Sequence, residues 1–182
     1  MVEPNGPALK LPNSMTRCQV QQMVMFLAKN GFHEARHSLE RESRVSFDQD
    51  YFRSLIETQQ LDQLLIADQY FSCIVSMNCR PSLVLAYQIR VHIYLLHLQS
   101  GAISVAKKFL KNVVVNTIKF HDVLFSTNSV DAIDSLTSCT PKDAAKLIPF
   151  HFDMLKELCR RTMSALIEPS DEEFGQRNAI RS

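Results

Sequence analysis

Residues 81–99 set the strictest condition on the fold, because they form a helix-length segment that is apolar on nearly every side. Pro81 suits the first turn of a helix, and Ser100-Gly101 is a typical end. The apolar positions are Leu83, Leu85, Ala86, Tyr87, Ile89, Val91, Ile93, Tyr94, Leu95 and Leu96. A helix that is apolar all round needs neighbours on every side. Within this segment, the apolar run Ile89–Leu98 is too short for a bilayer and is broken by Arg90, His92 and His97, so we predict a buried central helix.

The rest of the chain also has the composition of a helical protein. Only 4 of its 182 residues are glycine and 46% are hydrophobic, which favours helices over a turn-rich β fold. Amphipathic patterns predict further helices over residues 47–60, 61–71, 102–113, 120–125, 130–136 and 141–166. We expect the last one to break near Pro149. Val113–Val115 is β-branched and suits an extended segment, but no second strand is available to pair with it, so we predict an all-α fold.

An amphipathic helical hairpin is expected before these helices. Thr16 suits the N-cap of a helix that runs to about Asn30, where Asn30-Gly31 ends it, and a second helix follows from Phe32. The predicted self-association residues are the apolar positions of the two helices: Val20, Met23, Val24, Leu27 and Leu39. Neither short helix buries its apolar side alone, so the hairpin must dock on another copy or on the rest of the chain.

The composition of the two ends suggests the domain boundaries. Residues 1–14 hold Pro4, Pro7 and Pro12 and are expected to be a disordered leader, and residues 167–182 form a polar tail. Between them we expect the hairpin over residues 15–46 and an array of antiparallel helices over residues 47–166.

Charge and cysteine usage restrict the partners and the compartment. Lys and Arg number 20 and Asp and Glu 19, so no overall field attracts nucleic acid or an anionic membrane. The five cysteines form no C-x-x-C pair, and no apolar signal segment precedes them, which indicates reduced thiols in the nucleus or cytoplasm. Partners must therefore be recognised by local shape and apolar contact.

Four sequence blocks resemble the amino-terminal domain of plant TOPLESS co-repressors, which consists of a LisH motif followed by a CTLH region. The blocks are FLAKNGFHEARHSLERES, YFRSLIETQQLD, YQIRVHIYLLHL and VAKKFL, and the likeness covers roughly residues 16–166. It implies LisH-mediated pairing of subunits and a nuclear adaptor that binds short L-x-L-x-L repression peptides in a helical groove. It also implies the residues that line this groove: Arg80, Tyr87, Leu124 and Leu158.

The chain departs from the family pattern at several positions. Val84 and Val91 stand where the family has lysines that help to hold the peptide, and Leu61 replaces a tryptophan. The segment after Phe125 is about five residues shorter than the corresponding segment of the family. We therefore expect weaker and less salt-dependent peptide binding than in a typical family member.

Two other functions are alternatives to this adaptor: a scaffold subunit and a zinc peptidase. A LisH/CTLH scaffold subunit of a ubiquitin ligase or cytoskeletal complex is the alternative that shares the fold. His33-Glu34-Ala35-Arg36-His37 spells the zinc-peptidase motif H-E-x-x-H, but both histidines are expected on the solvated flank of the second hairpin helix, without a third ligand. His92 and His97 lie on different faces of the central helix. We therefore predict no enzymatic activity, no metal and no cofactor.

Overall fold

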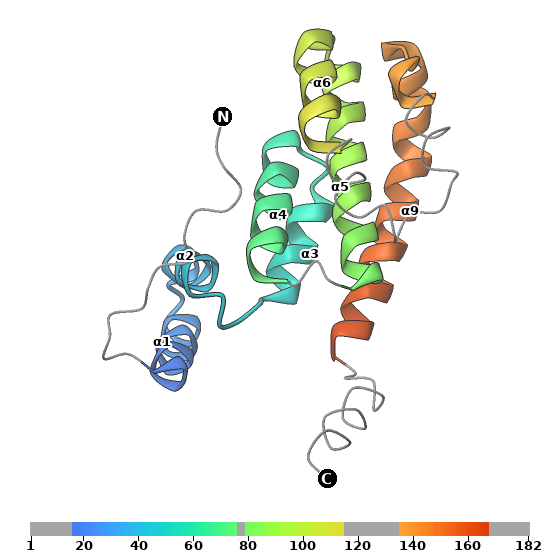
Figure 1. Cartoon of the computed structure of the whole chain (residues 1–182). Coiled ribbons are helices and arrows are strands. Elements are labelled where there is room, and N and C mark those ends of the chain that lie inside the picture. The colour runs from blue at the N-terminus through green and yellow to red at the C-terminus, as the bar shows by residue number, and fades with distance from the viewer. Residues whose placement is uncertain (1–15, 76–78, 115–134, 168–182) are drawn as a thin grey trace.

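The computed structural model describes residues 16–75, 79–114 and 135–167, and this part of the chain is helical and contains no strand. The predicted all-α fold is thus confirmed. In chain order the elements are α1 (Arg17–Lys29), α2 (His33–Ser43), α3 (Gln49–Glu57), α4 (Leu61–Ile74), α5 (Arg80–Gln99), α6 (Ile103–Phe109), the π-helical turn η1 (Leu110–Val114) and α9 (Pro141–Ile167). Figure 1 shows α1 and α2 as a hairpin beside a body formed by the other helices.

Helix α5 is the central helix that the sequence predicts. It begins with Pro81 in its first turn, and it packs against α4, α6, η1 and α9. Two apolar clusters meet on it. In one, Ile89 and Ile93 pack with side chains of α3, α4 and α9. In the other, Tyr94 and Leu98 pack with side chains of α6, η1 and α9, so that α9 contributes to both clusters.

Local signals position the helix ends where the sequence predicts them. Thr16 accepts a hydrogen bond from the backbone N–H of Gln19, and the Gln19 side chain accepts one from the N–H of Thr16 in return, a capping box. Gly31 adopts φ +74° between α1 and α2, a conformation that side chains with a Cβ rarely adopt. Asp48 caps α3 through the N–H groups of Asp50 and Tyr51, both at 3.1 Å.

Helix α9 contradicts the predicted break, since it is continuous from Pro141 to Ile167 with Pro149 inside it. Pro149 lacks only one backbone donor, and it lies on the exposed side of the helix, where water can hydrogen-bond the freed carbonyl group. Ile148 and Phe152 on either side of it are buried in the two different clusters. Packing on both sides of the proline therefore keeps the helix intact.

Other predictions are corrected or left untested. The helix predicted over residues 102–113 is present as α6 followed by η1, which contains Val113 and Val114, so the extended alternative is not adopted. The predicted helices at 120–125 and 130–136 fall mainly on residues 115–134, outside the described part of the chain, as do the predicted leader and the tail from residue 168. All five cysteines lie among the described residues, and none of them forms a disulfide. Among the described residues, no helix is both long enough and apolar enough to cross a membrane.

Candidate interaction surfaces

Helix α1 carries large apolar side chains on its exposed side. Val20 and Val24 are 0% and 4% exposed and are thus already covered within the chain. Met23 is 46% exposed, Met25 57% and Phe26 61%. The predicted apolar stripe of α1 therefore divides in two, and only part of it remains available to a partner.

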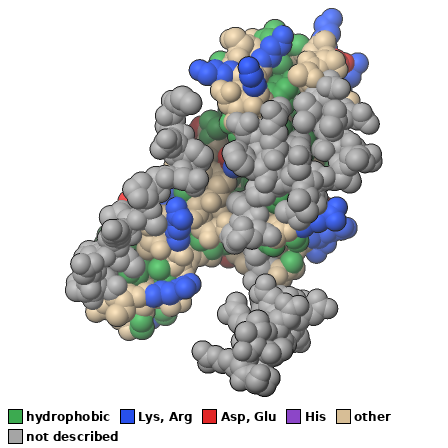
Figure 2. Space-filling model, viewed as in Figure 1, with side chains coloured by type: hydrophobic (Ala, Val, Ile, Leu, Met, Phe, Trp, Pro, Cys, Tyr) green, Lys and Arg blue, Asp and Glu red, His purple; other side chains and the backbone are tan. Residues whose placement is uncertain are grey.

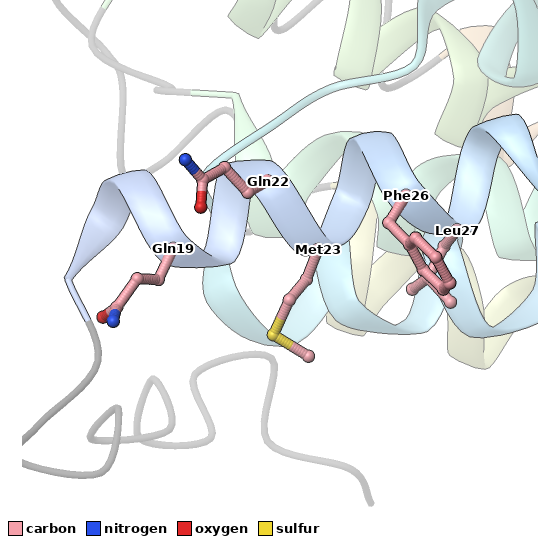
Figure 3. Close-up of a pocket in the computed structure, with 5 residues that line it drawn as sticks. All are labelled: Gln19, Gln22, Met23, Phe26 and Leu27. Atoms are coloured by element: carbon pink, nitrogen blue, oxygen red, sulfur yellow. The ribbon is translucent and has the colours of Figure 1, made fainter.

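The available part of α1 forms a shallow groove. The groove has a volume of about 570 Å³ and is lined by Gln19, Gln22, Met23, Phe26 and Leu27. Figure 3 shows that Met23 and Phe26 follow one another along α1, with Gln19 toward the start of the helix. We call this set the α1 face. Hydrophobic side chains also reach the surface of the hairpin in the space-filling view (Figure 2).

Two of the predicted self-association residues are only partly covered, and one further residue was missed. Leu27 lines the α1 face, and Leu39 lies on α2, each half-buried. Phe26 was not among the predicted residues. Its position three residues after Met23 was the signal that could have identified it, because residues at i and i+3 share a side of a helix.

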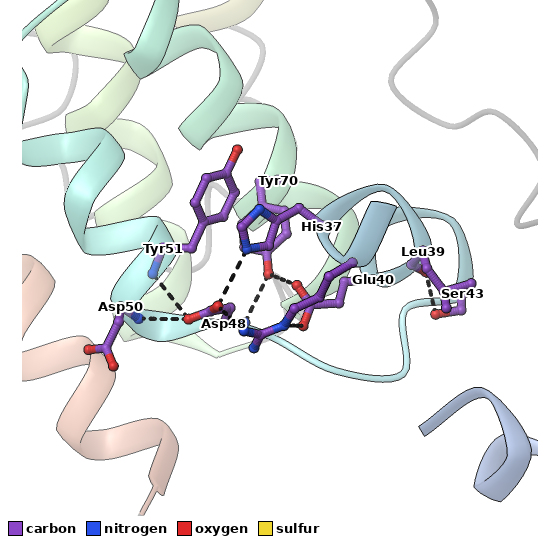
Figure 4. Close-up of polar contacts among 9 residues, drawn as sticks. His37, Leu39, Glu40, Ser43, Asp48, Asp50, Tyr51 and Tyr70 are labelled. Atoms are coloured by element: carbon purple, nitrogen blue, oxygen red, sulfur yellow. Dashed lines mark hydrogen bonds and ion pairs between the residues drawn. The ribbon is translucent and has the colours of Figure 1, made fainter. Parts of the chain in front are cut away.

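A buried polar cluster joins the hairpin to the body. Glu40 of α2 is 0% exposed, and it accepts hydrogen bonds from the Tyr70 hydroxyl at 2.6 Å and from Arg36 Nε at 3.1 Å. The Tyr70 hydroxyl also accepts a hydrogen bond from the backbone N–H of Asp48 at 2.8 Å. Arg36 Nη1 lies 2.8 Å from Asp48 Oδ2, which closes the network (Figure 4). We call this group, with His37, the hairpin–body joint.

The electrostatics of this joint keep the Asp48 carboxylate in an acceptor role. Burial alone raises the pKa of Asp48, but the Tyr51 N–H, the Arg36 guanidinium and His37 together bring it below its usual value. Burial, together with its hydrogen bond to Glu40, raises the pKa of Tyr70, so its hydroxyl stays protonated and can donate. The joint is therefore a satisfied network of buried polar groups.

His37 corrects the prediction of a solvated H-E-x-x-H flank. Its ring is buried, is stacked on Tyr51 with ring centroids 3.5 Å apart, and has Nε2 3.4 Å from Asp48 Oδ2. His33 is exposed as predicted. In the described ranges, no group of three or more His, Cys, Asp or Glu residues is arranged to hold a metal ion. The role of His37 in this structure is packing between α2 and α3.

The residues expected to line a peptide groove occupy different environments. Arg80 is exposed at the start of α5, whereas Tyr87 is only 7% exposed in the cluster with Val91 and Ile148. Leu158 is half-buried against the other cluster. Leu124 lies outside the described residues. The described residues therefore do not bring Tyr87 and Leu158 into one apolar cluster.

The sequence did not predict that His92 of α5 and His151 of α9 form a pair. His92 Nδ1 lies 3.1 Å from His151 Nδ1, and His151 Nε2 lies 2.9 Å from Gln88 Oε1. Burial lowers the pKa of His92 to about 4. Burial, and the neighbouring His92, lower the pKa of His151 to about 4 as well. The 59 residues that separate the two histidines leave no sequence pattern by which to pair them.

Comparisons with known proteins return no relative. A scan against protein-family models finds no match, and neither a search of curated proteins nor a search of solved structures finds one. The function of this chain is therefore argued from its own surfaces.

Proposed function

We propose that this chain is a non-enzymatic interaction module that pairs with a second copy of itself through the α1 face. The observation that carries this proposal is the exposure of Met23 and Phe26 beside a groove on a short helix. Side chains of this size gain about 1.5–3 kcal/mol each when they pass from full exposure to full burial. In a dimer with a twofold axis, the same surface of both subunits forms the interface. Met23 and Phe26 of each subunit would therefore be buried.

The hairpin is suited to this role because it is attached firmly to the body. The hairpin–body joint holds α2 on α3 and α4 through Glu40, Asp48 and Tyr70. A second copy would therefore meet an ordered surface and would lose little chain entropy on binding. The resemblance to LisH motifs, which pair subunits, points to the same surface.

The test compares two phenylalanines that differ in position. Phe26→Asp places a charge in the α1 face, whereas Phe150→Asp places one on α9, where Phe150 is 74% exposed. Light scattering at tens of micromolar is expected to find dimers or larger oligomers for the wild type and for Phe150→Asp, and monomers for Phe26→Asp. A wild type that stays monomeric, or a Phe26→Asp variant that still associates, contradicts the proposal.

Binding of short L-x-L-x-L peptides by the body, in the manner of a nuclear co-repressor, is the second part of the proposal. It rests on the resemblance to TOPLESS proteins, and the exposure of the Arg80 guanidinium at one end of α5 is compatible with it. Val91 is uncharged and buried, so it cannot take the place of the lysine that helps to hold the peptide in the family. If no such peptide binds, the alternative of a LisH/CTLH scaffold subunit is favoured. A scaffold subunit needs self-association but no peptide groove.

A further inference from the structure

The histidine pair between α5 and α9 contains a buried nitrogen without a partner. His92 is 0% exposed, and its ring is stacked on His151 with centroids 5.2 Å apart and lies next to Phe152. In the described part of the chain, its Nε2 has no hydrogen-bond partner. A buried polar atom without a partner is costly and calls for an explanation.

Proton counting explains how the pair is tolerated. When His151 Nε2–H donates to Gln88 Oε1, His151 Nδ1 carries a lone pair and accepts from His92 Nδ1–H. His92 Nε2 is then a bare lone pair among apolar groups. This arrangement suits two neutral rings. A proton added to His151 Nδ1 would face the Nδ1–H of His92. If the His92 hydrogen moved to Nε2 to avoid this clash, the Nε2–H would have no acceptor, and the pair would still carry a buried positive charge.

Among the described residues, burial lowers the pKa of His92 without a contribution from a charged group. Asp68 of α4 is bound to Arg90 at 2.9 Å, and Asp153 and Lys156 of α9 pair with each other at the surface. The lysines of α6 and η1 are exposed: Lys107, Lys108 and Lys111. Among the described residues, His151 is therefore the titratable neighbour of His92.

We propose that His92 and His151 form an acid-sensitive latch, which holds α9 on α5 while both rings are neutral and releases it when they take up protons. Helix α9 is the element that matters most, because it closes both apolar clusters through Ile148 and Phe152. Release of α9 would expose these side chains. The release of α9 does not involve the α1 face. The proposal of a latch can therefore be tested whether or not the chain self-associates.

The expected pH dependence follows from proton uptake. Each histidine has a folded-state pKa of about 4, against 6.5 for a free imidazole. The released state therefore binds more protons between these values, so docking of α9 weakens as the pH falls below about 6.5. Two protons taken up multiply the opening constant of α9 by up to about a hundredfold per pH unit, and one proton by about tenfold.

The first experiment uses the unmodified full chain. Imidazole nitrogen NMR from pH 7.5 to 4 is expected to show His92 and His151 neutral at pH 6. Hydrogen exchange of α9 amides, corrected for the intrinsic rate, is expected to rise more steeply on acidification than that of α2, which packs on α1 and α4. If either histidine of the pair is charged at pH 6, or α9 and α2 respond alike, the latch is refuted.

A variant series gives a second, independent test. The double change His92→Leu and His151→Leu keeps the site filled with apolar groups, and it should flatten the acid response of α9. His97→Leu is the matched control, because His97 is a half-buried histidine on the same helix that contacts Phe109, and it should keep the full response. A double variant with the wild-type response overturns the proposal. If the double variant does not fold, the nitrogen titration of the wild type decides alone.

Discussion

The sharpest stability prediction concerns the hydroxyl of Tyr70 in the hairpin–body joint. Tyr70→Phe removes one oxygen and keeps the buried ring. That oxygen donates to Glu40 at 2.6 Å and accepts from the N–H of Asp48 at 2.8 Å. Without it, a fully buried carboxylate loses a donor, and a backbone N–H loses its acceptor. A hydrogen bond to a charged group is worth about 1.5–3 kcal/mol and an ordinary one about 0.5–1.5 kcal/mol. We therefore expect a loss of about 2–4 kcal/mol in the free energy of unfolding.

Tyr51→Phe is the matched control for this prediction, because it deletes the same atom from a neighbouring tyrosine. The Tyr51 ring packs on His37 and remains in the variant, and among the described residues its hydroxyl has no hydrogen bond comparable to those of Tyr70. We expect a change within about 0.5 kcal/mol. Urea unfolding followed by circular dichroism measures both variants. Equal losses in the two variants, or a Tyr70→Phe loss below about 0.5 kcal/mol, would refute the reasoning about the joint.

Two further predictions concern the body. Ile89→Ala in the middle of α5 should lower the free energy of unfolding by about 2–5 kcal/mol in thermal unfolding, as large-to-small changes in a packed core do. Leu65→Ala should lower it far less, because Leu65 is 41% exposed on α4. Equal losses would mean that α5 is not the centre of the core. Calorimetric titration with an L-x-L-x-L peptide should give weak heat with the wild type and less with Arg80→Ala. No heat at high micromolar peptide would remove the co-repressor part of the proposal.

Features with local causes could be predicted from the sequence. The start of α5 follows from Pro81, which fits a first helical turn, and the start of α1 from Thr16, whose side chain caps it. The buried position of α5 follows from its apolar residues on all sides. Each of these rests on a preference that acts within a few residues.

The errors arise where distant parts of the chain decide the outcome. Pro149 by itself suggests a helix end, but packing of Ile148 and Phe152 in separate clusters outweighs one lost backbone hydrogen bond. His37 by itself suggests a solvated position, but docking of α2 on α3 buries it. On α1, the sequence indicated the apolar positions Val20 and Met23. It did not show that Val20 is buried within the chain whereas Met23 remains exposed.

The two buried polar clusters respond differently to acid because one is built from charges and the other from neutral rings. Asp48 in the hairpin–body joint has a pKa held below its usual value of 3.8, so this carboxylate keeps its charge until the pH falls below that value. The stability that it contributes is present above pH 3.8 and is lost only below it. The pair of His92 and His151 loses its contribution at higher pH, between about 6.5 and 4. Mild acid should therefore release α9 first, while the hairpin stays attached to α3 and α4 and keeps the surface proposed for self-association.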